Sequence, residues 1–321
     1  MLRAFSRRGA LAGIVAVVAV MAFFSVPAFA AAPSATTGAA SAVTYQSATL
    51  AGSVRPGGLS TVVYFQYGTT SKYGVQSAPV QVAAGSKSVP ISIPISGLTA
   101  TTTYHYRIVA TNATGTALGA DMTVKTAKIP LALAITAAPD PVVVGAPLTL
   151  EGTLSGTGSA GAVVHLQANP YPYTAGFADV GNPELTLATG SFAFNVLGIA
   201  VNTKFRVVSG KTVSSVVTVS ASVGVTLTTR QVGTKRHPAV RFSGAISPAE
   251  PSARIAIERL NGTSWKVVGG TVASPTTNKS GAVSFTKTIP MHHGGFFRAL
   301  VLPVEGAHVS GYSGPVLVSV R

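Results

Sequence analysis

The sequence contains no cysteine and very little acid. Its 321 residues include eight Asp and Glu against 23 Lys and Arg, a formal net charge of +15 at pH 7. Without cysteine, disulfide scaffolds, cysteine–zinc sites, iron–sulfur clusters and thiol nucleophiles are excluded. So few carboxylates, together with six histidines, also argue against carboxylate-rich active sites and acidic metal cages. We therefore expect no cofactor and no enzymatic activity.

The sequence patterns of common enzyme classes are also missing. No G-x-S-x-G elbow, glycine-rich phosphate loop or dinucleotide-binding motif occurs. Asp179 and Glu184 fall in one loop, where a carboxylate pair could meet. His292 and His293 are neighbours on an extended chain, so their side chains point to opposite sides and rarely bind one ion. A secreted hydrolase with an unrecognised site is the remote alternative.

The first thirty residues have the features of a secretory signal peptide. Three arginines within the first eight residues precede an uncharged run, 9–32, which contains an apolar stretch and the small-residue triplet Ala28-Phe29-Ala30. This order predicts export, with cleavage after Ala30 of a signal at 1–30. The alternative is an uncleaved anchor, because the run is long enough to span a membrane. We expect a secreted or cell-surface protein that uses the Sec route rather than the twin-arginine route, with no integral membrane domain after cleavage.

Three short phrases recur along the rest of the chain. The spacing between successive copies of the first phrase matches that of the last phrase to within one residue, so one unit of about 95 residues is used three times, the size of an immunoglobulin-type sandwich. The first phrase is a strand-like segment that ends in glycine, at Gly52, Gly152 and Gly244. The second is a strand-like segment that ends in Gln or Glu, at Gln66, Gln167 and Glu258. The third has an aromatic residue directly before an arginine, at Arg107, Arg206 and Arg298.

The periodicity within each unit is that of β-strands. Apolar residues alternate with other residues in 104–111, 192–197 and 316–320, as expected for half-buried strands. Asn261-Gly262 between two such runs predicts a tight hairpin, because glycine readily adopts positive φ. No window of about twelve residues after the signal has the helical period, so we predict an all-β protein nearly free of helix.

The first unit resembles a known family. Its run 98–115, LTATTTYHYRIVATNATG, is similar to the fibronectin type III pattern, in which Leu and Thr precede a Tyr and the following strand ends in Ala-x-Asn-x-x-Gly. The run 63–74, VYFQYGTTSKYG, is similar to a strand of bacterial fibronectin type III domains. The resemblance implies that Tyr104 is the tyrosine corner, whose hydroxyl ties a loop to the backbone. Leu50 stands where an early strand of this family usually has Trp. The sequence contains no Arg-Gly-Asp, so integrin binding is not expected.

The later units resemble bacterial Ig-like domains, the third being a divergent copy. The predicted fold is therefore three tandem Ig/fibronectin-III-like β-sandwiches behind an N-terminal signal peptide. Short junctions predict a stiff string of domains, and a small-residue, non-periodic segment before the first unit predicts a flexible leader. The expected boundaries are 1–30 for the signal, 31–42 for the leader, 43–127 for the fibronectin type III-like domain, 128–222 for the Ig-like sandwich and 223–321 for a basic Ig-like sandwich.

One loop of the middle unit could recognise carbohydrate. Tyr171, Tyr173 and Phe177 lie in a proline-rich segment after a core strand. Aromatic rings stack on sugars, and proline stiffens their support. The alternative is that the three rings cap the open end of the sandwich.

The last unit could bind anionic polymers. Segment 223–321 has eleven basic and three acidic residues, and Lys235, Arg236 and Arg241 are the candidate contacts. The alternative is that its cations are spread over both sheets and only keep the protein soluble. Specific nucleic-acid binding is not expected, because aromatic residues between the cations are few and Trp265 is the only Trp.

These features predict an exported bacterial protein without catalysis, which acts in structure or adhesion at the cell surface or outside it. A rigid string of sandwiches would present loops and a basic C-terminal domain to an extracellular polymer or protein. The alternative is a dedicated binding module for cell-wall polysaccharide or teichoic acid. We expect a monomer with weak attraction to anionic surfaces.

Overall fold

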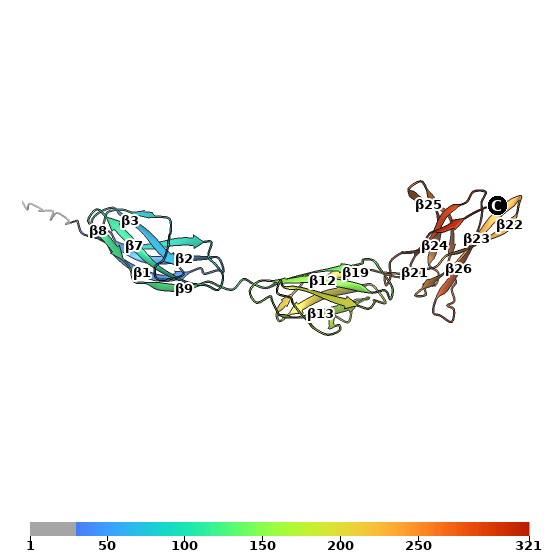
Figure 1. Ribbon diagram of the computed structural model, residues 1–321, viewed down its shortest axis with the longest axis horizontal. Coiled ribbons are helices and arrows are strands. Elements are labelled where there is room, and N and C mark those ends of the chain that lie inside the picture. Colours follow the sequence, from blue (N-terminus) through green and yellow to red (C-terminus); the bar gives the residue numbers. More distant parts are fainter. Residues whose placement is uncertain (1–29, 321) are drawn as a thin grey trace, which may run out of the picture. The chain divides into compact units, whose positions relative to one another are not determined.

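The computed structural model describes residues 30–320, and every regular element within them is a β-strand. The predicted all-β fold of Ig/fibronectin-III-like sandwiches is confirmed by the strand order given below. The chain divides after Ala127 into two compact units (Figure 1). Within the described residues, no helix is long and apolar enough to cross a membrane. The predicted signal at 1–30 lies almost wholly outside them.

The first unit is one sandwich with a single apolar core. Its largest fully buried side chains include Leu50, Phe65 and Tyr106. One sheet has the order β1-β2-β6, made of β1 (Ser34–Ser41), β2 (Ser47–Arg55) and β6 (Val89–Ser96). The other pairs β3 (Thr61–Gly68) with β7 (Thr103–Asn112), and is completed by β4 (Val75–Gln76), β5 (Val80–Val82), β8 (Gly115–Leu118) and β9 (Met122–Lys125).

The prediction that residues 31–42 form a flexible leader is wrong. Most of it is β1, which pairs antiparallel with β2. The Tyr106 hydroxyl donates to the Gly38 carbonyl and accepts from the Ala40 N–H, both at 2.9 Å, and the Thr37 hydroxyl accepts from the Ile108 N–H. An edge strand held by its backbone needs no alternating apolar side chains, so local sequence gave no sign of it.

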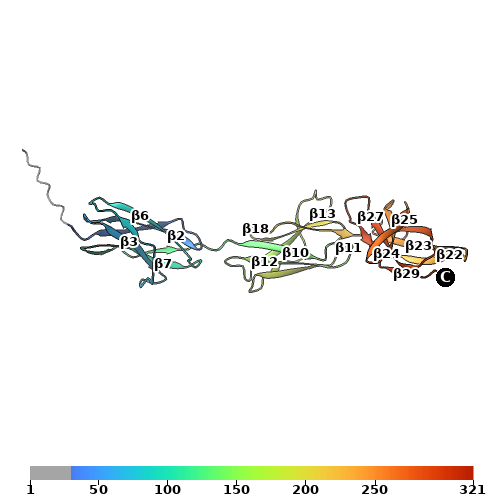
Figure 2. The same cartoon turned by 90° about the horizontal axis from the view of Figure 1, so that it is seen from above.

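The second unit begins with a sandwich (Figure 2), and this sandwich has its own apolar core. One sheet has the order β10-β12-β16, made of β10 (Ala132–Ala138), β12 (Leu148–Ser155) and β16 (Ser191–Val196). The other pairs β13 (Val163–Pro170) with β17 (Thr203–Ser209), flanked by β14 (Ala178–Asp179), β15 (Glu184–Leu185), β18 (Thr212–Val213) and β19 (Val217–Val219). In addition, β11 (Val142–Val143) pairs in parallel with β20 (Ala221–Ser222).

The C-terminal sandwich repeats this plan around a further core. In one sheet β23 (His237–Ser247) lies between β26 (Val283–Pro290) and the two strands β21 (Gly224–Val225) and β22 (Thr228–Thr234). The other has β24 (Arg254–Asn261) between β25 (Ser264–Val272) and β27 (Gly295–Leu302), followed by β28 (Gly311–Tyr312) and β29 (Val316–Val318). The hairpin predicted at Asn261-Gly262 is present, with a φ of 62° at Gly262.

The repeated sequence phrases mark one contact that occurs in every sandwich. The guanidinium Nε of each repeated arginine donates to the side chain that ends the second phrase. The distances are 2.9 Å from Arg107 to Gln66, 2.8 Å from Arg206 to Gln167 and 2.7 Å from Arg298 to Glu258. The aromatic residue before each arginine points the other way and is buried in the core.

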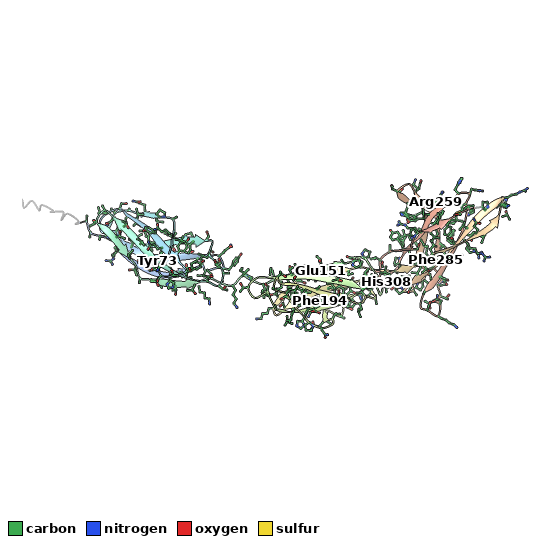
Figure 3. All side chains as sticks on the ribbon, viewed as in Figure 1. Tyr73, Glu151, Phe194, Arg259, Phe285 and His308 are labelled. Atoms are coloured by element: carbon green, nitrogen blue, oxygen red, sulfur yellow. The ribbon has the colours of Figure 1, made fainter. Side chains whose placement is uncertain are left out.

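Backbone and side-chain hydrogen bonds join the two sandwiches of the second unit. The Asn202 N–H donates to the Ala307 carbonyl at 2.8 Å, and its side-chain amide donates to Gly306 at 2.9 Å. The ring of His308, which is labelled in Figure 3, lies between the Glu250 carboxylate, 2.6 Å from Nδ1, and the Ala200 carbonyl, 2.8 Å from Nε2. These bonds fix the loop before β28 against the middle sandwich.

Candidate functional site

The three cations predicted to bind anions lie on one hairpin. Lys235 and Arg236 form the turn between β22 and β23, and Arg241 lies on β23 directly opposite Arg230 of β22. All four side chains are exposed, and none takes part in an ion pair among the described residues. We call these four residues the basic hairpin.

The strands of the sheet that carries the basic hairpin have no acidic side chains. No Asp or Glu occurs on β21, β22, β23 or β26. Two of the three carboxylates of this sandwich are engaged elsewhere: Glu250 with His308, and Glu258 with Arg298. Arg230 is one of the basic residues of segment 223–321 that the sequence offered for such a patch, and the register of the hairpin places it directly opposite Arg241.

The remaining cations of the sandwich are spread more widely. Arg254, Arg259 and Lys266 lie on the hairpin of the opposite sheet, Lys279 lies in a loop, and Lys287 lies on β26. The Arg259 guanidinium donates to the Gly294 carbonyl at 2.7 Å. The positive charge of this sandwich therefore has one concentrated part and one dispersed part.

The aromatic loop of the middle sandwich already has partners. The Lys204 ammonium lies 4.2 Å from the ring centre of Tyr173, and the Arg206 guanidinium lies 4.2 Å from that of Phe177. Tyr171 and Tyr173 meet edge to face, with an interplanar angle of 83°. Both rings cannot lie flat against one sugar in this arrangement. Recognition of carbohydrate by Tyr171, Tyr173 and Phe177 remains a prediction.

Tyr104 closes a loop of the first sandwich. Its hydroxyl accepts a hydrogen bond from the Thr99 N–H, five residues upstream, at 2.9 Å. This contact has the form of the tyrosine corner that the resemblance implied. It ties the loop before β7 to the strand itself.

A polar cluster on the first sandwich was not anticipated. Asp121 accepts from the Tyr73 hydroxyl at 2.9 Å, and its other oxygen lies 2.8 Å from His105 Nδ1. The Arg107 guanidinium lies 4.7 Å from the ring centre of Tyr73. The hydrogen bond with His105 lowers the pKa of Asp121, whereas partial burial of the carboxyl raises it. The hydrogen bond from Tyr73 and the charge of Arg107 also lower this pKa. Among residues 30–320, the side-chain hydrogen-bond partner of His105 is Asp121, and no hydroxyl group is bonded to its ring.

We expect Asp121→Asn to flatten the acid limb of the stability profile of the first sandwich. A carboxyl whose pKa is lowered by folding stabilises fully above its unfolded-state value of 3.8, and this stabilisation is lost as the pH falls through the folded-state value. The loss should stay below about 1 kcal/mol, because the partners are exposed. Calorimetry between about pH 6 and pH 3 measures it. An equally steep acid limb in the variant would contradict the assignment.

Metal binding finds no support in the described chain. Residues 30–320 contain no group of three or more His, Cys, Asp or Glu side chains that could hold a metal ion. His292 and His293 lie exposed between β26 and β27.

Comparison with known proteins leaves the family open. No family model and no curated protein matches the sequence. Among solved structures, the chain is similar to the FN1–FN3 domains of chicken CNTN1, with 11% identity over 91% of this chain and 99% of that chain, at a TM-score of 0.27. A TM-score this low supports no conclusion about the fold or function of this chain. The assignment of Ig/fibronectin-III-like sandwiches rests on the strand order and pairing described above.

Proposed function

We propose that this chain is an exported, non-catalytic structural or adhesion protein that acts at or outside a bacterial cell surface and holds anionic polymers on its basic hairpin. Sandwiches of this kind serve as rigid supports that present loops and hairpins. The fold alone does not specify a ligand, so the surface has to do so. The basic hairpin brings four exposed cations together, and none of them has an ionic partner among the described residues.

The observation that carries this proposal is the pairing of Arg230 with Arg241. Like charges directly opposite each other destabilise a strand pair. No carboxylate on this sheet offsets the repulsion between the two guanidinium groups. An external anion between them would remove that cost, and Lys235 and Arg236 extend the same positive surface to the tip of the hairpin.

The chemistry favours a polymer that carries phosphate or carboxylate groups. Arginine binds both groups through two parallel hydrogen bonds, whereas lysine acts as a point charge. Several weak contacts along one flexible chain add up. Because the field of exposed charges decays over about 8 Å at physiological salt, binding should weaken strongly as salt rises.

Chromatography of the full-length protein on phosphocellulose tests the proposal. The double variant Lys235→Ala with Arg236→Ala should elute at clearly lower salt than the wild type. The matched control, Lys266→Ala with Lys279→Ala, removes the same charge from the same sandwich away from the basic hairpin, and should elute close to the wild type. Equal losses in the two variants would overturn the proposal, because they would show that only net charge matters.

A further inference from the structure

A second surface of the C-terminal sandwich is apolar and exposed. It is the outer face of the sheet formed by β25, β24, β27, β28 and β29, on the side away from the core. Cross-strand register puts Phe296 beside Leu317 and Leu300 beside Tyr312 on this face. Phe296 is 46% exposed, Tyr312 52% and Leu317 62%. We call the following residues the apolar face: Leu260, Trp265, Val267, Phe296, Leu300, Leu302, Tyr312 and Leu317.

One cross-strand pair on the corresponding face is polar in the other two sandwiches. Two residues before the repeated arginine, the first sandwich has His105, paired with Thr123. The middle sandwich has Lys204 at this place, paired with Thr218. The C-terminal sandwich replaces both polar residues of this pair with Phe296 and Leu317. Since one plan is used three times, this exposed apolar pair is a property of the third copy alone and is not required by the fold.

The centre of the apolar face carries no net charge. The Arg298 guanidinium lies 4.4 Å from the ring centre of Trp265 and 4.1 Å from that of Tyr312. Its Nε donates at 2.7 Å to Glu258, the one carboxylate on these strands. At one end of the face, exposed Arg254 pairs with Leu302 and Val272. The face therefore combines aromatic rings, aliphatic side chains, a neutralised ion pair and an unpaired cation at its margin.

We infer that the apolar face docks on an anionic lipid surface. Trp and Tyr favour the boundary between water and hydrocarbon, because their rings are apolar and their N–H or O–H group is polar. The strands under the face pair with each other, so contact with lipid leaves few backbone groups without a partner. Exposed Arg254 at the margin of the face complements anionic headgroups.

This inference goes beyond the proposed function, since it uses the sheet opposite the basic hairpin. Arg230 and Arg241 lie on the sheet of β22, β23 and β26, and the apolar face lies on the other sheet. A sandwich packs its two sheets face to face, so their outer faces point in opposite directions. The protein could then hold a polymer on one side while the other side rests on lipid.

The single tryptophan of the chain makes a direct test possible, because Trp265 lies on the apolar face. The full-length protein is mixed with phosphatidylglycerol vesicles whose acyl chains carry bromine, which quenches Trp fluorescence at short range. We expect quenching and a shift of the emission to shorter wavelength. Vesicles of phosphatidylcholine should produce much less of both. Co-sedimentation with phosphatidylglycerol vesicles but no quenching would overturn the inference, and so would the absence of co-sedimentation.

Variants separate this face from the basic hairpin. Phe296→Ser with Leu317→Ser should weaken vesicle binding roughly tenfold or more, because two large apolar side chains no longer leave water. The control Leu185→Ser with Leu187→Ser removes exposed leucines of the middle sandwich and should bind as the wild type does. Lys235→Ala with Arg236→Ala should retain the quenching, so the inference and the proposed function can fail separately. Equal binding by the face variant and its control would refute the lipid contact.

Discussion

Replacing Arg298 with alanine is expected to destabilise the C-terminal sandwich by about 3–5 kcal/mol. The Glu258 side chain is only 10% exposed and accepts the Arg298 Nε–H at 2.7 Å. Without the guanidinium, Glu258 is a nearly buried charge with no partner, which is costly in a medium of low polarity. The rings of Trp265 and Tyr312 also lose the cation between them. Chemical denaturation followed by Trp265 fluorescence measures the change.

The paired variant Glu258→Gln with Arg298→Ala is the control. Gln stands at the equivalent positions 66 and 167 of the other sandwiches, so a neutral amide fits this place in the fold. The double variant should therefore recover a large part of the stability that Arg298→Ala alone loses. If the double variant is no more stable than the single one, loss of the stacking contacts and not the orphaned charge explains the effect.

Gly244→Ala is expected to lower the free energy of unfolding by an amount near the upper end of about 1–3 kcal/mol. Gly244 lies on β23 directly opposite Phe285 of β26, whose ring covers it. A Cβ there would come within 2.7 Å of the ring carbon Cε1 and still nearer to the Thr226 carbonyl oxygen. The ring can turn aside, but the backbone oxygen cannot move without disturbing the neighbouring strand. Thermal and urea unfolding of the full-length protein quantify the loss.

Gly270→Ala is the matched control for this prediction. Gly270 lies on β25 of the same sandwich, and the nearest atom to a Cβ built there is the Ile255 carbonyl oxygen at 3.5 Å, an ordinary contact. The substitution should change stability by less than about 0.5 kcal/mol, or raise it slightly by restricting the unfolded chain. A similar loss at both glycines would mean that strand glycines here serve flexibility and not close packing.

The repeated phrases were readable in the sequence because each is tied to a local rule. Period-two alternation requires only that one face of a strand be buried, so segments such as 104–111 and 192–197 were recognisable alone. The recurring Gly52, Gly152 and Gly244 lie where a neighbouring strand and a large side chain leave no space for a Cβ. The spacing of glycines and arginines matches because each sandwich places both residues at equivalent positions of its strands.

Other features depend on partners far away in the sequence. Residues 34–41 become β1 through bonds from Tyr106 and Ile108, and their own side chains carry no signal of a strand. Lys204 and Arg206 meet the rings of Tyr173 and Phe177 across a loop. Glu250 and His308, 58 residues apart, meet where the two sandwiches of the second unit join. None of these contacts has a sequence spacing that predicts it.

The sequence by itself determined the class of the fold, the repeated plan and the uneven charge, because strand alternation, turn glycines and residue counts need no knowledge of distant partners. Only the tertiary structure decided which charges remain free and which surfaces are exposed. Arg298 and Arg241 are equally basic in the sequence, yet the fold gives Arg298 a carboxylate and places Arg241 opposite another arginine. The physical reason is register: pairing between strands assigns each side chain its neighbours and its face, and the residues that set this register are separated along the chain.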